Sequence, residues 1–240
     1  MIVSAVSGQF LVVTQADHAR FAADLLRLMP RQETAFHPRR ELLLRAVADH
    51  DNGWWESDSS PRRNPTGTAP LDFREVDDLD RLEIWRRGID RFGSTEPYVA
   101  AMVAGQALRL LGGRIEAGEA WRTFLGETVG RRDEFATAAG VTLEALVEDD
   151  GWLALADELS LALCTGDPTF VDRPGWRVDV ALSCDGARLA VAPFPLAGAT
   201  TLSLPCRLLE MRHHRSDAEL ARELALLRWR RIPVRVAPLA

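Results

Sequence analysis

The sequence contains no lysine, so all 29 basic side chains among its 240 residues are arginine. This excludes Schiff-base chemistry, a P-loop lysine and an S-x-x-K nucleophile, because each of them needs a lysine amine. Cysteine is also scarce: Cys164, Cys184 and Cys206 are odd in number, lie far apart and form no C-x-x-C pair. We therefore expect reduced thiols in a cytoplasmic protein.

Long apolar runs are missing as well. Charged side chains interrupt every apolar stretch before the ~18 residues that a membrane-spanning helix requires. The first residues, MIVSAVSGQF, lack the basic region of an export signal. The chain carries 35 acidic residues and a net charge of -6, with a pI near 5.5. A nucleic-acid binder needs a basic surface, so we do not expect nucleic acid as a partner. Without a long apolar run, we do not expect a membrane as a partner either.

What the sequence does contain is apolar patterning with two different periods. Two β-branched runs at the N-terminus, 2–6 and 10–13, predict a hairpin. Helical spacing dominates a body over about residues 14–165, and extended runs return over about 167–240. We expect a single α+β domain over residues 1–240, with a mainly α-helical body and a small antiparallel sheet formed by the N-terminal hairpin and the C-terminal strands.

Several helix boundaries follow from local signals. Thr14 and Asp17 have the form of a capping box, and the next helix is expected to begin at Pro38 and to end with Asn52-Gly53 in a left-handed conformation. Residues 54–76 contain several prolines and no helical period, which favours a functional lid or a binding loop. Later in the chain, separate helices are expected near 142–149 and 152–164.

Ionisable side chains on helix faces that must be buried are the most informative residues. His18 precedes Phe21, Ala22 and Leu25 by three, four and seven positions, so an imidazole shares their apolar face. A lone histidine in this position is usually a core residue bonded to a backbone carbonyl.

Two further helices repeat this pattern. His50 follows Val47 and Leu43 at helical spacing and is followed by Asp51, and Asp157 lies among Leu153, Ser160, Leu161 and Cys164. A buried carboxylate needs a cationic partner or a metal, although an arginine or partial exposure would also explain Asp157. Together the two imidazoles and two carboxylates form a nitrogen and oxygen ligand set that Zn, Mn or Fe accepts. Their spacing matches no standard zinc motif.

The order of these residues resembles the HD superfamily of metal-dependent phosphohydrolases, whose ligands H…HD…D come from separate helices. The segments TQADHARFA, AVADHDNGW, PLDF and DELSLALC resemble, over nearly the whole chain, a family of uncharacterised bacterial proteins known as a domain of unknown function. The resemblance implies a helical HD-like body and a divalent ion (Mn, Fe, Zn or Mg) held by His18, His50, Asp51 and Asp157. It also implies a catalytic role for Asp51, whose two oxygens can bridge a second ion.

The candidate substrate-binding residues are Gln106, Trp54, Arg62 and Arg63. Gln106 lies on an apolar helix face, where the uncharacterised family carries a histidine, and glutamine is a poor ligand for transition metals. Trp54 directly follows the HDNG segment and can line a pocket or simply anchor the loop. Arg62 and Arg63 can bind a phosphate as a fork, or they are a solvated charge pair.

Two functions remain open from the sequence. The first is hydrolysis of a small phosphorylated substrate, a phosphoester or a nucleotide, by metal-activated water. The second is a non-catalytic HD-like binding or assembly protein with a degenerate site, in which the same residues form a buried polar network and the sheet serves as a partner or homodimer surface. Gln106 favours the second function, whereas the complete H…HD…D order favours the first.

Overall fold

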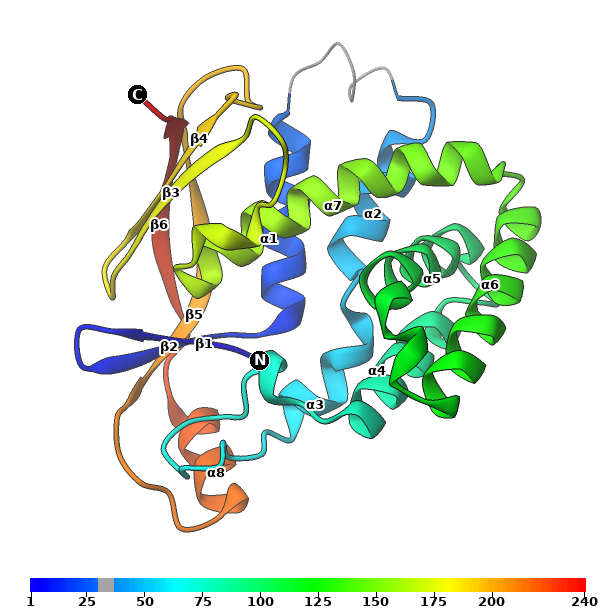
Figure 1. Ribbon diagram of the computed structural model, residues 1–240. Coiled ribbons are helices and arrows are strands. Elements are labelled where there is room, and N and C mark those ends of the chain that lie inside the picture. The colour runs from blue at the N-terminus through cyan, green and yellow to red at the C-terminus, as the bar shows by residue number, and fades with distance from the viewer. Residues whose placement is uncertain (30–36) are drawn as a thin grey trace.

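A computed structural model describes residues 1–29 and 37–240 of the chain (Figure 1). Helices and strands alternate in groups, and the strands cluster at the two ends of the sequence. The helices are α1 Gln15–Leu28, α2 Arg40–Asp49, α3 Trp55–Ser59, α4 Asp78–Arg91, α5 Pro97–Leu111, α6 Glu119–Ala139, α7 Leu143–Thr165 and α8 Asp217–Leu226; the short 3₁₀ helices are η1 Asn52–Trp54, η2 Phe73–Glu75, η3 Gly112–Ala117 and η4 Pro168–Phe170. The strands are β1 Ile2–Val6, β2 Gln9–Val13, β3 Arg177–Leu182, β4 Ala187–Ala192, β5 Thr200–Glu210 and β6 Arg230–Pro238.

The strands form one six-stranded sheet in the order β1-β2-β5-β6-β4-β3. The N-terminal hairpin joins the C-terminal strands through antiparallel pairing of β2 with β5, as expected from the sequence. The expectation of a purely antiparallel sheet is wrong, because β4 and β6 pair in parallel. After β5 the chain passes through α8, and β6 then returns antiparallel to β5 and inserts between β5 and β4. With β5 on one side and β4 on the other, β6 runs antiparallel to β5 and parallel to β4.

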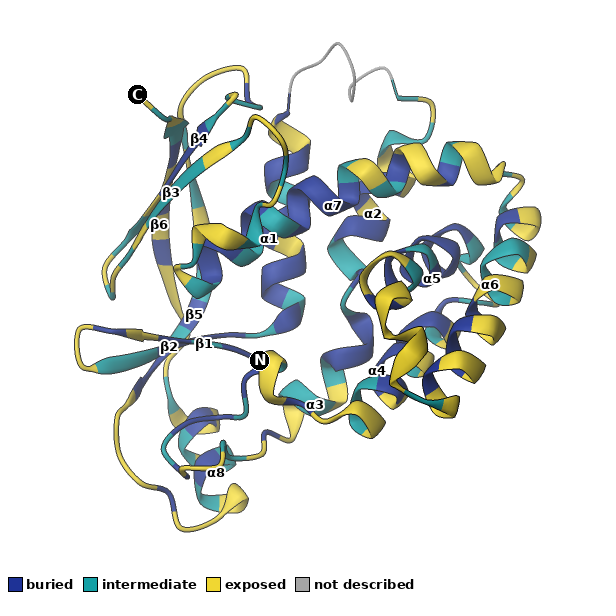
Figure 2. Ribbon diagram, viewed as in Figure 1, coloured by how far each residue is buried: buried dark blue, intermediate teal, exposed yellow. Residues whose placement is uncertain are grey.

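The sheet is covered differently on its two faces. Helices α1 and α7 pack against one face, and one hydrophobic cluster contains residues of these helices, of α5 and of β2, β5 and β6 (Figures 1 and 2). A second, smaller cluster joins Val12 and Leu209 of the sheet to Leu220 and Leu224 of α8. Successive residues of a strand point to opposite faces, so α8 lies on the face opposite α1 and α7. Among the described residues, no helix has both the length and the apolar character of a membrane span.

Three local expectations need correction. The second helix begins at Arg40 instead of Pro38, because the backbone N–H of Arg39 bonds to His37 Nδ1 in a preceding turn. The helices expected near 142–149 and 152–164 are one continuous helix, α7, since burial of its apolar residues outweighs the cost of Gly151, about 1 kcal/mol relative to alanine. Residues 54–76 contain α3 and η2 and are not structureless.

Candidate metal centre

Three helices bring His18, His50 and Asp157 together in the interior. Thr14 caps the N-terminus of α1 by accepting a hydrogen bond from Asp17 N, and His18 lies in the first turn on the buried face of the helix. His50 is the C-cap residue of α2, and Asp157 lies in the middle of α7 among buried alanines and leucines. The exposed fractions of His18, His50 and Asp157 are 0%, 1% and 5%. The sequence prediction that these three residues face the core is confirmed.

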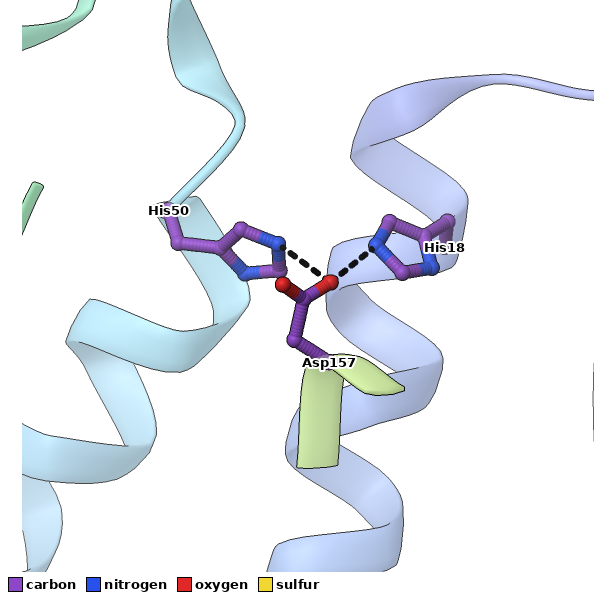
Figure 3. A group of neighbouring side chains, drawn as sticks. All are labelled: His18, His50 and Asp157. Atoms are coloured by element: carbon purple, nitrogen blue, oxygen red, sulfur yellow. Dashed lines mark hydrogen bonds and ion pairs between the residues drawn. The ribbon is translucent and has the colours of Figure 1, made fainter. Parts of the chain in front are cut away.

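The distances within this group fit a shared ion. Asp157 Oδ1 lies 3.0 Å from His18 Nε2 and 3.4 Å from His50 Nε2 (Figure 3). One ligand atom from each residue lies within 4.8 Å of the others. Ligand atoms bound to one ion at about 2.1 Å are about 3.0 Å apart at a right angle and about 3.4 Å apart at the tetrahedral angle. The group is therefore able to hold a metal ion.

The hydrogen bonds of Ser160 determine which nitrogen of His18 carries a proton. Ser160 Oγ donates to the carbonyl oxygen of His18 at 3.0 Å, because that oxygen can only accept. The same Oγ, 2.7 Å from His18 Nδ1, must then accept the Nδ1 proton. In neutral His18 the lone pair is consequently on Nε2, which faces Asp157. This second bond of the imidazole is typical of histidines that bind metals.

His50 has the same arrangement on the opposite side of Asp157. Its Nδ1 donates to the carbonyl oxygen of Val47 at 2.7 Å, so in the neutral ring the lone pair is again on Nε2. His50 Nε2 is buried and has no partner that meets hydrogen-bond geometry within the described part of the chain. Burial acts to lower the pKa of His50, but the charges of Asp51 and Asp157 outweigh it and raise this pKa well above its ordinary value. The centre thus attracts a positive charge, either a proton or a metal ion.

Asp157 responds in the opposite sense. Burial acts to raise the pKa of this carboxyl group, and the interactions with His50 and His18 outweigh burial and lower the pKa below its ordinary value. The carboxylate form is therefore favoured, which is the form that a metal ion requires.

Asp51 and Gln106 complete the surroundings of the three buried residues. Asp51 Oδ2 lies 3.7 Å from His18 Nε2 and 3.5 Å from His50 Nε2, and its side chain is 12% exposed. Gln106 Nε2 donates to Asp157 Oδ2 at 3.3 Å, while Gln106 Oε1 is buried without a partner among the described residues. Both residues therefore border the centre, and Asp51 is the more accessible of the two. The group whose ligand atoms all lie within 4.8 Å of one another consists of His18, His50 and Asp157, so the role of Asp51 as a fourth ligand stays a prediction.

Sequence reasoning missed the residues that hold the His50-Asp51 segment in place. Asn52 Nδ2 donates to the carbonyl oxygens of Asp49 and Gly88. Gly53 lies directly against α4, where a Cβ atom would be 2.1 Å from the carbonyl oxygen of Ile84. The expected left-handed stop at Asn52-Gly53 is wrong, because the chain continues as η1 and Gly53 is required for close approach. The sequence signal that could have indicated this close approach is the glycine within the polar segment His50-Asp51-Asn52-Gly53.

The other predicted substrate-binding residues contact different parts of the molecule. Trp54 packs with Val76 and Ile84 and is 5% exposed. Arg62 forms an ion pair with Asp80 of α4. Trp54 and Arg62 line one cavity of about 300 Å³.

Arg63 is engaged by α8 and the turn before it. Its Nε donates to Asp217 Oδ1 at 2.9 Å and its Nη1 donates to the carbonyl oxygen of His214 at 2.8 Å. The contacts described for Arg62, Arg63 and Trp54 are thus separate from the histidine–aspartate group, and their roles in substrate binding stay predictions.

Comparison with known proteins gives one match. No curated protein and no solved structure is significantly similar to the chain. The model of one family, described as "Protein of unknown function (DUF3891)", matches residues 1–211, which include the complete histidine–aspartate centre. Because this match covers most of the sequence, the chain belongs to the DUF3891 family.

Proposed function

We propose that the protein is a metal-dependent hydrolase of the HD type that acts on a phosphoester or a nucleotide. The observation that supports this proposal is the direction of the lone pairs. Ser160 and Val47 fix the Nδ1 protons of His18 and His50, so both Nε2 atoms face the carboxylates of Asp157 and Asp51. When both imidazoles are neutral, groups that only accept hydrogen bonds face one another here, and a divalent cation would satisfy all of them.

The chemistry that we propose assigns a role to each residue. His18, His50 and Asp157 would hold the ion, and Asp51 would complete its ligands. A divalent ion in such a site supplies an activated water as nucleophile and polarises a phosphoryl oxygen. Asp51 is the most exposed of the four and would be positioned to accept a proton from the attacking water. Gln106 would orient Asp157 through its amide and would present Oε1 to the bound water or substrate.

A second candidate is the non-catalytic binding or assembly protein, and one contact favours it. Gln106 donates to Asp157 Oδ2, and a single proton between His18 Nε2 and Asp157 Oδ1, 3.0 Å apart, would join these two residues without an ion. Elemental analysis of protein purified without chelator separates the two candidates. The hydrolase is expected to retain a transition metal or to gain thermal stability on addition of Mn²⁺ or Zn²⁺. Less than half an equivalent of metal together with no thermal shift would support the binding protein.

Substitution of Asp51 tests the ligand assignment. Asp51→Ala is expected to abolish bound metal and hydrolysis while leaving the far-ultraviolet circular dichroism spectrum unchanged, since Asp51 is partly exposed and lies outside a regular helix. Asp90→Ala removes an exposed carboxylate of α4 that pairs with Arg131 and serves as the matched control. Activity is measured on phosphomonoesters, phosphodiesters and nucleotides with added Mn²⁺ or Zn²⁺. A variant Asp51→Ala that keeps its metal would show that the assignment is wrong.

A further inference from the structure

A second cavity lies on the side of α1 that faces away from His18. Its volume is about 530 Å³, and its lining comes from the N-terminal part of α1, from α3, from β5 and from α8. In Figure 1, α3 and α8 lie at the same end of the molecule, on either side of the N-terminus. Ala16 and Arg20 are four residues apart and contribute the α1 wall, so this wall and the metal centre use different faces of one helix.

Arg207 of β5 is the unusual side chain in this cavity. Leu204, Cys206 and Leu208 of β5 belong to the main core, whereas Leu209 packs beneath α8. Since Arg207 is two residues from Leu209 on the same strand, it shares the face that α8 covers. The sheet thus contributes an arginine to the lining of the cavity, next to the apolar contact between Leu209 and α8.

The guanidinium of Arg207 forms no ion pair in residues 1–29 and 37–240, although the more distant charges of Asp17 and Asp58 act to raise its pKa. Its Nε is buried without a hydrogen bond, and the contact that the structure gives it is stacking on the indole of Trp229, with 3.9 Å between Cζ and the ring centroid. Burial lowers the pKa of Arg207 from its ordinary value. A desolvated charge without a partner is costly. A stacked guanidinium keeps its in-plane N–H groups free to bind a carboxylate or a phosphate.

The carboxylate that lines the same cavity is already engaged. Asp58 accepts a hydrogen bond from the backbone N–H of Gln15 at 2.6 Å, and its other oxygen lies 2.8 Å from the terminal ammonium of Met1. Arg20 adds a second guanidinium to the lining, 65% exposed and 3.4 Å from Asp17. The lining therefore leaves positive charge available to a ligand.

Most of the remaining lining of the cavity is apolar. Trp55 of α3, Leu224 of α8 and Trp229 provide aromatic and aliphatic surface next to Arg207. We propose that this cavity, the Arg207 pocket, binds a small organic anion that carries an aromatic or apolar group. The carboxylate or phosphate of this ligand pairs with Arg207, and its apolar part lies against Trp55 and Leu224. The site is independent of the metal centre and of the proposed hydrolysis.

Isothermal titration calorimetry without added metal tests this assignment. The ligands are 3-phenylpropionate and phenyl phosphate, which compare a carboxylate with a phosphate, together with inorganic phosphate and the neutral 3-phenylpropanol. We expect at least one aromatic anion to bind and to exceed both the neutral alcohol and inorganic phosphate by about tenfold or more. Binding is expected to be unchanged in Asp51→Ala, which separates this pocket from the metal centre.

A matched pair of arginine substitutions and a third substitution that narrows the cavity test the role of Arg207. Arg207→Gln is expected to lower the affinity by about tenfold or more without lowering the melting temperature, because it removes an unpaired charge. Arg222→Gln makes the same charge change at an exposed position of α8 and is expected to bind normally. Ala225→Trp, which narrows the cavity without touching the charge, is expected to block binding. Equal affinity in wild type and Arg207→Gln, equal loss in Arg222→Gln, or no binding of either anion at millimolar concentration would overturn the proposal.

Discussion

Helix α7 carries two buried aspartates eight positions apart, and their surroundings differ in kind. Asp149 is surrounded by donors: it lies 2.6 Å from His37 Nε2, accepts from Arg39 Nε at 2.9 Å and Nη2 at 3.2 Å, and accepts from the Tyr98 hydroxyl at 2.6 Å. Asp157 receives one long hydrogen bond from Gln106 and otherwise faces the Nε2 atoms of two histidines.

The protonation of the histidines explains this difference. His37 Nδ1 accepts the backbone N–H of Arg39, so the proton of neutral His37 is on Nε2 and points at Asp149. His18 and His50 donate through Nδ1, which directs their lone pairs towards Asp157. A buried aspartate next to histidine is therefore structural in one place and a candidate metal ligand in the other. The group bonded to Nδ1 of the histidine decides which of these two roles the neighbouring aspartate has.

The largest effect on stability is expected from removal of Asp149, the aspartate that is surrounded by donors. Asp149→Ala leaves Arg39 without its carboxylate and Tyr98 without its acceptor, which is expected to lower the free energy of unfolding by about 3–5 kcal/mol. Chemical denaturation measures this loss. Metal content of the folded fraction is expected to stay at the wild-type level. A loss of metal at unchanged stability would contradict the comparison.

Asp157→Asn is expected to change stability little and to weaken metal binding strongly. The asparagine amide can donate to the Nε2 lone pairs of His18 and His50, so the free energy of unfolding of the metal-free protein is expected to change little. Loss of a ligand is expected to weaken metal binding by more than about 100-fold, beyond the effect of losing a supporting hydrogen bond. Calorimetric titration with Zn²⁺ measures the affinity. Unaltered affinity would remove Asp157 from the site.

Gly53 tests how firmly the second histidine is positioned. Gly53→Ala places a Cβ atom against the carbonyl oxygen of Ile84 and is expected to cost about 1–3 kcal/mol of stability and to weaken metal binding by moving His50 and Asp51. Gly126→Ala is the control, since its Cβ would meet nothing within 4 Å in the middle of α6. This control is expected to gain about 0.5–1 kcal/mol. Thermal and chemical denaturation, with and without Zn²⁺, compare the two.

The smallest effect is expected at Ser160. Ser160→Ala removes the acceptor of the His18 Nδ1 proton, so the orientation of the lone pair towards Asp157 is no longer fixed. Metal affinity is expected to fall by about tenfold, at the lower end of the range for such supporting groups. Ser59→Ala, an exposed serine of α3, is the control. Identical zinc affinities in wild type and Ser160→Ala would mean that Ser160 does not orient the ring.

The sequence predicted His18, His50 and Asp157 because each is a polar residue within an apolar helix face, and this signal is local. Asp149 also lies between apolar residues at helical spacing, Leu146 and Leu153, but the helix boundary expected between residues 149 and 152 separated them and hid this signal. Its partners come from a turn and from α5 and are brought to it only by folding. The protonated nitrogen of each histidine was equally hidden, since it depends on Ser160 and on one carbonyl oxygen.

The fold shows the same difference between features with a local sequence signal and features that depend on long-range contacts. The hairpins and strands were predictable from local alternation and turn residues. The parallel pairing of β4 with β6 was not, because it depends on the insertion of β6 between β5 and β4 after α8. Gly151 suggested a helix boundary, but the tertiary contacts of α7 keep the helix continuous. Local signals thus predicted the elements, and long-range packing decided their arrangement.

The most direct test of the metal centre is nitrogen-15 NMR spectroscopy of the imidazoles in metal-free and Zn²⁺-loaded protein. We expect the neutral rings of His18 and His50 to carry their proton on Nδ1, and their Nε2 resonances to shift on addition of Zn²⁺. The His37 resonances are expected to show the opposite tautomer and to stay unchanged. Protons on Nε2 of His18 and His50 at neutral charge, or Nε2 resonances that do not respond to Zn²⁺, would contradict the metal centre.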